Sequence, residues 1–541
     1  MLDINSTWVR NCLSSMSIEQ KIGQLLHPYF KPEMDIKKQI EGLCGIQVGG
    51  AFFFPSTIDK FTHLSHEVQK HASVPVIISS DLENGAGRMI NDGVTFPDNM
   101  AIAATRNTEF AMVMGESAAK EGRECGLHWS FGPVVDINAN PYNPITNTRS
   151  FGDDPDVIAK MSTAMINGMQ RAGMAACAKH FPGDGYDDRD QHLCTTVNPL
   201  TKEEWMRSCG AMFQSAIDSG VYSIMVGHIS LPSIDSGESG RIEQAPPAVM
   251  SHKIVTGLLR KEMGFEGVII TDAIEMGGSC THYPESEVVV RSIEAGCDQI
   301  LFCNVPQAFS AIFEAYKTGR LTLERIEASV IRILALKEKL GLNSNKSVKT
   351  CSLADKAFFK STSLSAAENA ITVVRSPRYP KVTTITPGQK VLSLHVRGDG
   401  KYNVDKIDEL LLERGVNVVR WDETHNEDSE LLNDLNQYDH ILMHAVFGPT
   451  WSTNRIRLAG NYNRALVRIM KSHHKSVMMT SFGSPYHLYE FPLTPTYINA
   501  YSPDESMQKA YIKLIFGEIN GDGVSPVDIE KMFISNRHLN C

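Results

Sequence analysis

The sequence predicts an α/β protein with two domains, an N-terminal (β/α)8 TIM-like barrel and a C-terminal α/β sandwich domain. The chain has 541 residues, which is too long for one ordinary core. Its first part, of roughly 340 residues, alternates short apolar runs with longer amphipathic stretches, as repeated βα units do. The same alternation resumes after a polar break. These observations together favour two α/β domains in series.

Seven apolar runs in the first part are predicted to be barrel strands. They are Ala51–Phe54, Val76–Ser80, His128–Val135, Met174–Ala178, Ser223–Val226, Val268–Thr271 and Gln299–Phe302. Helical stretches such as Glu109–Gly122 and Ile158–Ala172 fall between them. Seven strands, with an eighth that gives no clear signal, fit a barrel of about 250 residues or more.

The domain boundary is predicted from a change of pattern. Leu321–Leu342 has the spacing of a long amphipathic helix, and the segment NSNKSVKTCS then breaks the periodicity. We therefore expect a catalytic barrel over 1–342, a linker over 343–367 and a second domain over 368–541. Its predicted strands are Val391–Val396, Val416–Trp421, His440–Val446, Ser476–Phe482 and Tyr497–Ser502, which alternate with helices such as Asn463–Lys471 and Asp504–Phe516.

Composition and charge exclude several classes of function. The net charge of −10 gives no indication of a nucleic-acid or anionic-membrane partner. No apolar run approaches the ~20 residues of a membrane helix, and the N-terminus lacks the features of a signal peptide, so we expect a cytoplasmic protein. The eleven cysteines are scattered without a C-x-x-C pair, which predicts reduced thiols and no metal site. We also expect no cofactor, because no dinucleotide fingerprint, P-loop or metal-ligand spacing is present.

The segment Lys179–His192, KHFPGDGYDDRDQH, gathers polar groups directly after the predicted strand Met174–Ala178. In a parallel α/β fold, active sites lie where strands end and loops begin. Asp190 and His192 are spaced so that the carboxylate can orient the imidazole. A histidine held in this way can donate and accept a proton near neutral pH.

This segment resembles the signature of family 3 glycoside hydrolases, specifically the β-N-acetylglucosaminidase branch. That signature reads roughly KHFPGHG, followed by four residues and D-S-H. The spacing is kept, but Asp184 replaces a histidine and Gln191 replaces the serine. The resemblance, which extends over essentially the whole chain, implies that His192 is the acid/base group and that Asp190 orients it. Asp184 is expected to belong to a solvated loop face. The alternatives are that it raises the pKa of His192, or that Asp190 is not the partner of His192.

A second segment, GVIITDAIEM, carries Asp272 at the end of a predicted strand. A single aspartate at such a place more often caps the next helix. Its similarity to the nucleophile segment of the same family, roughly GLVVTDDLEM, implies that Asp272 is the catalytic nucleophile, although Ala273 replaces the second aspartate. A retaining glycosidase needs one carboxylate to attack the anomeric carbon and a second group to protonate the leaving oxygen.

Further residues are implied in sugar binding by the resemblance. Asp81, in SSDLENGAGRM, is similar to a carboxylate that accepts hydrogen bonds from ring hydroxyls, and capping of a turn is the alternative. Arg149, in NTRSFGDDP, aligns with an arginine that holds the terminal sugar. Lys179 and His180 are expected to donate to sugar hydroxyls. His228 stands equally between a residue that lines the site and a structural one.

The expected function is a retaining exo-β-N-acetylglucosaminidase that removes terminal β-linked GlcNAc from chitooligosaccharides or muropeptide fragments. A β-glucosidase of the same family is one alternative. A phosphorylase is another, because a histidine in place of a carboxylic acid removes a negative charge and opens the site to phosphate. A non-catalytic sugar-binding protein is the third, supported by the changes at Asp184, at Ala273 and in the Asp81 loop. The resemblance also implies a homodimer.

Overall fold

A computed structural model describes residues 2–529, apart from 238–243, 345–350, 377–381, 399–401, 423, 426–427, 453–455 and 459–461. The chain divides into two compact units, and each is described here by itself. The first unit comprises Met1–Thr95, Ala111–Ile137 and Ile158–Phe359. The second comprises Phe96–Phe110, Asn138–Val157 and the chain from Lys360 onward. Two short segments of the N-terminal half therefore belong to the second unit, which chain order alone does not show.

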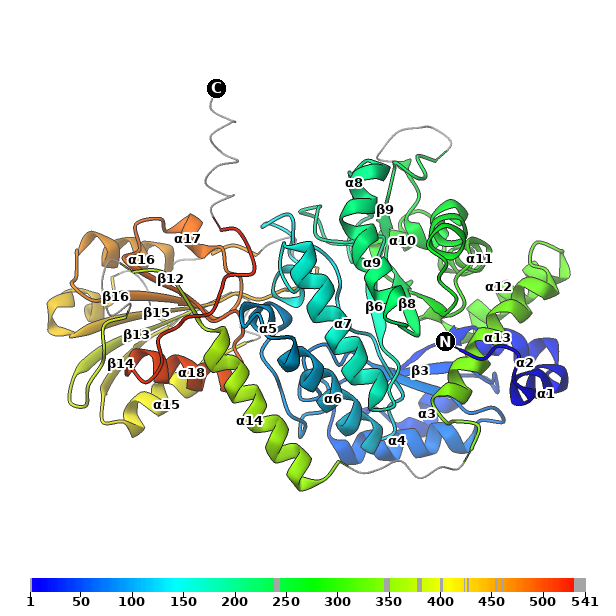
Figure 1. Cartoon of the computed structure of the whole chain (residues 1–541), viewed down its shortest axis with the longest axis horizontal. Coiled ribbons are helices and arrows are strands. Elements are labelled where there is room, and N and C mark those ends of the chain that lie inside the picture. Colours follow the sequence, from blue (N-terminus) through cyan, green and yellow to red (C-terminus); the bar gives the residue numbers. More distant parts are fainter. Residues whose placement is uncertain are drawn as a thin grey trace. The chain divides into compact units, whose positions relative to one another are not determined.

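The first unit is a parallel barrel (Figure 1). Around the ring its described strands are β1 (Leu26–His27) with β2 (Tyr29–Phe30), β3 (Gly50–Phe53), β4 (Ile77–Ser80), β5 (Trp129–Ser130), β6 (Cys177–Phe181), β8 (Ser223–Val226), β10 (Val268–Thr271) and β11 (Ile300–Leu301). Neighbours pair in parallel, and bridges from Trp129 to Ala175 and from Ile270 to Gln299 link the groups. The pairing of β1 with β11 completes the ring.

Burial explains why these strands are apolar along their whole length. Every residue of β3, β4, β6, β8 and β10 is buried, as expected for parallel strands covered on both faces. The predicted barrel is confirmed, and the strand position without a clear sequence signal is the pair β1 and β2, which Pro28 separates. The run His128–Val135 is strand only over Trp129–Ser130, because Gly132 and Pro133 interrupt it.

Helices and short elements connect the strands. They are α1 (Thr7–Ser15), α2 (Ile18–Gln24), α3 (Ile36–Glu41), α4 (Ile58–Lys70), α6 (Thr108–Glu124), α7 (Pro155–Arg171), β7 (Thr196–Val197), α8 (Lys202–Arg207), α9 (Cys209–Asp218), β9 (Ile229–Ser230), η3 (Ala248–Met250), the π-helix η4 (Lys253–Glu262), α10 (Gly277–Cys280), α11 (Glu285–Ala295), α12 (Val305–Lys317) and α13 (Leu323–Lys339). In the part of the chain that the structure describes, none of the helices is long and apolar enough to cross a membrane.

The second unit is built on a six-stranded sheet in the order β12-β17-β16-β15-β13-β14. Its strands are β12 (Thr372–Arg375), β13 (Lys390–Arg397), β14 (Asn417–Trp421), β15 (His440–Val446), β16 (Val477–Ser481) and β17 (Thr496–Asn499). All pairs are parallel except β12 with β17, so the sheet is mixed. The sequence did not predict the edge strand β12. Helices α15 (Lys406–Glu413), α16 (Tyr462–Lys471), α17 (His487–Glu490) and α18 (Glu505–Ile515) accompany the sheet.

The early segments of the second unit are part of its core. Helix α5 (Asn99–Ala104) contributes Met100, Ala101 and Ala104 to the same buried cluster as the sheet. The short helix η1 (Asn147–Arg149) packs against α5. Of the predicted linker 343–367, residues 345–350 lie outside the described residues, and those from Leu353 onward form part of helix α14 (Leu353–Ala370).

Candidate active site

The predicted nucleophile lies at the carboxyl end of β10. The backbone N–H of Asp272 donates to the Val226 carbonyl at 2.8 Å, and its own Oδ1 accepts from the Ala273 N–H at 2.8 Å. Burial by itself would raise the pKa of this carboxyl, but the imidazoles of His180, His228 and His192 and the Ala273 N–H outweigh it and hold the pKa below its usual value. Asp272 is therefore ionised at neutral pH, as a nucleophile must be.

Asp190 and His192 pair as the sequence predicts. The Nδ1 of His192 lies 2.6 Å from Oδ1 of Asp190, which also accepts the His192 backbone N–H at 2.8 Å. The carboxylate is fully buried, whereas the imidazole is 29% exposed. With Nδ1 bound to the carboxylate, proton exchange with a reactant falls to Nε2, the other ring nitrogen.

The dyad and the nucleophile share one site. The Gly277 N–H donates to the His192 carbonyl at 2.9 Å, and the Gly278 N–H donates to the Gln191 carbonyl at 3.0 Å. These bonds join the loop after Asp272 to the loop that carries His192. A Cβ at Gly277 would lie 2.9 Å from the His192 carbonyl oxygen, so this approach of the two loops requires glycine.

Lys179 links two carboxylates beside this site. Its ammonium lies 2.8 Å from Asp81 Oδ1 and 2.7 Å from Glu83 Oε1, and only 3% of its side chain is exposed. Asp81 is 40% exposed, so its carboxylate is open to a hydroxyl of a bound sugar. Sequence reasoning missed Glu83, although it stands two residues after Asp81 in the same strand-end loop.

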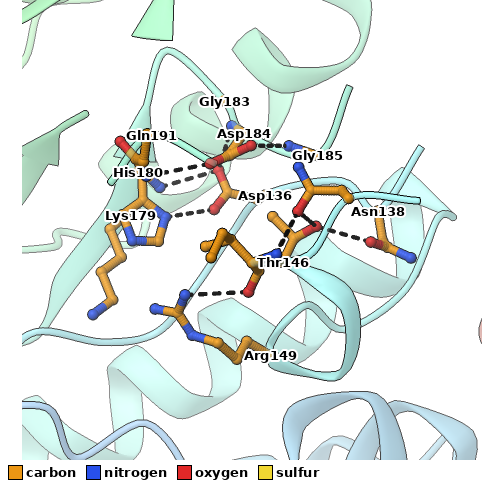
Figure 2. A network of polar contacts seen from close by, with 12 residues as sticks. Asp136, Asn138, Thr146, Arg149, Lys179, His180, Gly183, Asp184, Gly185 and Gln191 are labelled. Atoms are coloured by element: carbon orange, nitrogen blue, oxygen red, sulfur yellow. Dashed lines mark hydrogen bonds and ion pairs between the residues drawn. The ribbon is translucent and has the colours of Figure 1, made fainter. Parts of the chain in front are cut away.

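His180 is held by a second carboxylate that the sequence analysis did not single out. Oδ2 of Asp136 lies 2.7 Å from His180 Nδ1, and Oδ1 accepts the backbone N–H groups of His180 and Asp184 at 3.0 and 2.8 Å (Figure 2). Asp136 is 1% exposed. Its position directly after the apolar run that ends at Val135 was a signal that could have identified it.

Asp184 is not on a solvated loop face, so that expectation was wrong. Its side chain is buried, with 3% of the residue exposed, and its carboxylate accepts from the Gly185 N–H and from the Gln191 side-chain amide. The tight turn explains the burial, because Gly183 and Gly185 both have positive φ values, 117° and 98°. This geometry folds the short loop back against the end of β6.

His228 is fully buried. Its Nε2 donates to the Ala273 carbonyl at 2.8 Å, and burial lowers the pKa of the imidazole although the neighbouring Asp272 opposes this. A fully buried ring that supports the backbone beside Asp272 favours the structural side of the two alternatives. Its place in sugar binding stays a prediction.

Arg149 belongs to the second unit, and the structure does not group it with the residues above. It ends η1, its carbonyl accepts from the Asn99 amide at 2.7 Å, and its guanidinium donates to the Ile145 carbonyl at 3.2 Å (Figure 2). Among the described residues, no cluster of three or more histidine, cysteine or acidic side chains is arranged to hold a metal ion.

The fold and the site together are those of an enzyme. The fold is a parallel barrel, and the site holds an ionised carboxylate and an Asp-His pair at the carboxyl ends of the strands. Residues 17–336 match the glycosyl hydrolase family 3 N terminal domain, and the chain belongs to this family of glycoside hydrolases. The chain is 32% identical, over 97% of its length and 96% of the other, to a β-N-acetylglucosaminidase/β-glucosidase of Cellulomonas fimi.

Solved structures agree with this assignment over both units. The β-glucoside phosphorylase BglX bound to 2FGlc matches with a TM-score of 0.88 at 30% identity, covering 98% of each chain. A family 3 β-N-acetylglucosaminidase from Paenibacillus sp. str. FPU-7 matches with a TM-score of 0.82 at 26% identity, covering 95% of this chain and 99% of the other. The resemblance drawn from the motifs is thereby confirmed, including the two-domain form.

Proposed function

We propose that this chain is a retaining exo-β-N-acetylglucosaminidase that removes terminal β-linked GlcNAc from small oligosaccharides, such as chitooligosaccharides or muropeptide fragments. The observation that carries the proposal is the 2.6 Å pair of His192 with the buried Asp190 in the site of the ionised Asp272. The sugar is supported by the Cellulomonas fimi and Paenibacillus relatives, whose names both include β-N-acetylglucosaminidase.

The reaction proceeds in two displacements. Asp272 attacks the anomeric carbon while protonated His192 gives its Nε2 proton to the leaving oxygen, so that the glycosidic bond breaks and a glycosyl-enzyme forms. Neutral His192 then takes a proton from water as the water oxygen attacks the anomeric carbon and releases Asp272. The two steps together return the enzyme to its original protonation state, and neither requires a cofactor.

The groups around Asp81 are proposed to hold the terminal sugar. Its exposed carboxylate accepts from ring hydroxyls, and the Lys179 ammonium that pairs with it fixes its charge and direction. His180 and Arg149 are proposed as further contacts to the sugar, as the resemblance implies. A site with a charged acceptor discriminates against sugars that lack the matching hydroxyl, since the carboxylate would then lose a hydrogen-bond donor that the bound sugar supplies.

Phosphorolysis is the second candidate, with phosphate in place of water in the second step. The β-glucoside phosphorylase BglX matches this chain over 98% of its length, and a histidine acid/base carries less negative charge than a carboxylate. A first experiment compares initial rates on an aryl β-N-acetylglucosaminide and an aryl β-glucoside, each with and without phosphate. Preference for the N-acetyl sugar without a phosphate effect supports the proposal. Acceleration by phosphate with release of sugar 1-phosphate favours the phosphorylase.

Two variants test the assigned roles. Asp272→Ala should abolish turnover while sugar binding is retained, because the covalent route is lost. His192→Ala should slow substrates with poor leaving groups by about 10²–10⁴-fold and activated aryl glycosides far less, because only the former need the proton. Equal losses on both substrates would contradict the acid/base assignment.

A further inference from the structure

The two positions at which the catalytic loop departs from the family signature, Asp184 and Gln191, contact each other. Nε2 of Gln191 donates to Oδ2 of Asp184 at 3.2 Å. Both residues are buried, with 3% of Asp184 and 1% of Gln191 exposed. Figure 2 shows the two side chains close to His180 and Asp136. A donor amide facing an acceptor carboxylate makes a matched pair, and Gln191 directly precedes His192 in the chain.

Gln191 makes hydrogen bonds through both ends of its side-chain amide and through its backbone carbonyl. Its Oε1 accepts the His228 backbone N–H at 3.0 Å, and its carbonyl accepts the Gly278 N–H at 3.0 Å. Its amide orientation is fixed, because the His228 backbone N–H only donates and must face Oε1, which leaves Nε2 for Asp184. The residue therefore ties the loop both to His228, just after β8, and to helix α10, which follows β10 in the chain.

Asp184, the partner of Gln191 in this contact, is itself held beside β6. Its backbone N–H donates to Asp136 Oδ1, which also holds the His180 backbone, and its own Oδ1 accepts from Gly185 at 2.6 Å. Two glycines leave room for the arrangement: a Cβ at Gly227 would lie 3.1 Å from Gln191 Oε1, and one at Gly278 would lie 2.7 Å from the Gln191 carbonyl. A serine at 191 would be too short to make both side-chain bonds.

We propose that Asp184 and Gln191 form a clamp that positions the His192 imidazole for proton transfer, an inference that rests on the proposed function. Neither residue is a catalytic residue in this scheme. Asp190 sets the direction of the ring, and the clamp sets the place of the loop relative to Asp272. Because proton transfer depends steeply on distance, a displacement of about 1 Å can cost about 10²-fold in rate.

The test uses the full chain and two aryl β-N-acetylglucosaminides, one with an activated and one with a poor leaving group. Gln191→Ala and Asp184→Ala should each lower kcat/KM on the poor leaving group by about 10- to 100-fold and change the activated substrate by less than about threefold. The double variant should lose less than the product of the two single fold-losses, because both changes remove the shared contact between Gln191 and Asp184.

Conservative and control variants separate positioning from folding. Asp184→Asn keeps the shape and an acceptor oxygen for Gln191, but its amide nitrogen then faces the Gly185 N–H, so it should recover part of the rate that Asp184→Ala loses. Arg189→Ala alters the same loop by removing a guanidinium that is 48% exposed; its partner Asp187, 8% exposed, keeps the Val197 N–H as a donor, so both rates should stay within about twofold. Thermal melts of each variant report whether a rate loss follows unfolding.

The outcomes distinguish this inference from the proposed function. If His192→Ala depends on the leaving group and the clamp variants slow both substrates equally, or if the two single losses add in the double variant, the clamp is overturned and the function stands. If His192→Ala itself shows no dependence on the leaving group, the acid/base assignment fails, and the positioning role falls with it. Leaving-group dependence in all three variants supports both.

Discussion

Lys179→Met provides a test of the ion pairs that Lys179 makes with Asp81 and Glu83. The change removes an ammonium that lies 2.8 Å from Asp81 and 2.7 Å from Glu83 and that is 3% exposed. Asp81 is 40% exposed and can be hydrated, but only 8% of the Glu83 side chain is exposed, so Glu83 bears the loss. Removing one partner of a buried ion pair destabilises a protein by about 3–5 kcal/mol. We expect this loss at pH 8.

The loss should depend on pH. Without Lys179, burial raises the pKa of the Glu83 carboxyl above that of the unfolded chain. The folded variant then binds more protons than its unfolded state, so its stability falls as pH rises. The deficit relative to the wild type should accordingly be smaller at pH 5 than at pH 8.

Urea denaturation followed by intrinsic fluorescence measures the effect, because Trp129 and Trp205 are fully buried in the first unit. The matched control is Lys202→Met, which breaks an ion pair with Glu262 at 2.9 Å. The two side chains are 43% and 42% exposed, so the free energy of unfolding should fall by about 1 kcal/mol or less. A loss below about 1 kcal/mol for Lys179→Met at pH 8, or the same loss at both pH values, would refute the argument.

Three further predictions concern titration. His180→Ala should move the acid limb of the kcat/KM pH profile upward, because His180 is the largest of the influences that lower the pKa of Asp272; an unmoved limb would contradict this. Burial raises the pKa of Asp504 to about 6, so the folded state keeps this proton to a higher pH than the unfolded state does. The stability of the wild type should therefore fall by about 3 kcal/mol between pH 4 and 7. Thermal melts should find this fall reduced in Asp504→Asn. Burial lowers the pKa of Lys337 to about 7, so stability should rise from pH 7 toward 10, and Lys337→Met should remove that slope in urea titrations.

The sequence predicted elements best where a fully buried strand leaves a continuous apolar run. The runs Ser223–Val226, Val268–Thr271 and His440–Val446 have the same bounds in the structure as in the prediction. The signal failed for β1 and β2, which are two residues each, and for the edge strand β12. Strands of two residues carry too little periodicity to be separated from loops. Strand β12 is as long as β8 and β10, but only its first residue is buried, so it leaves no continuous apolar run.

The residues of the candidate site also differ in how far the sequence could predict their contacts. Residues within one motif, such as Asp190 and His192, could be paired from their spacing, because a local turn brings them together. Asp136 could not be assigned to His180 in this way, since 44 residues separate them and the sheet alone makes them neighbours. The contact of Asp184 with Gln191 was hidden by a run of nearby acidic residues, which suggested exposure. Burial at a loop is a tertiary property, and the sequence around Asp184 carried no trace of it.

The geometry of the dyad bears on the choice between water and phosphate. After His192 gives up its proton, the pair keeps one negative charge, but that charge lies on Asp190, which is fully buried behind the ring. An acceptor at Nε2 therefore meets a neutral imidazole edge, with the carboxylate one ring further away. A carboxylate in the place of His192 would put the charge in contact with the acceptor and repel an anion at short range. In the proposed mechanism, an anionic acceptor therefore meets less repulsion than it would at a carboxylate, and the ratio of rates with and without phosphate measures the size of this difference.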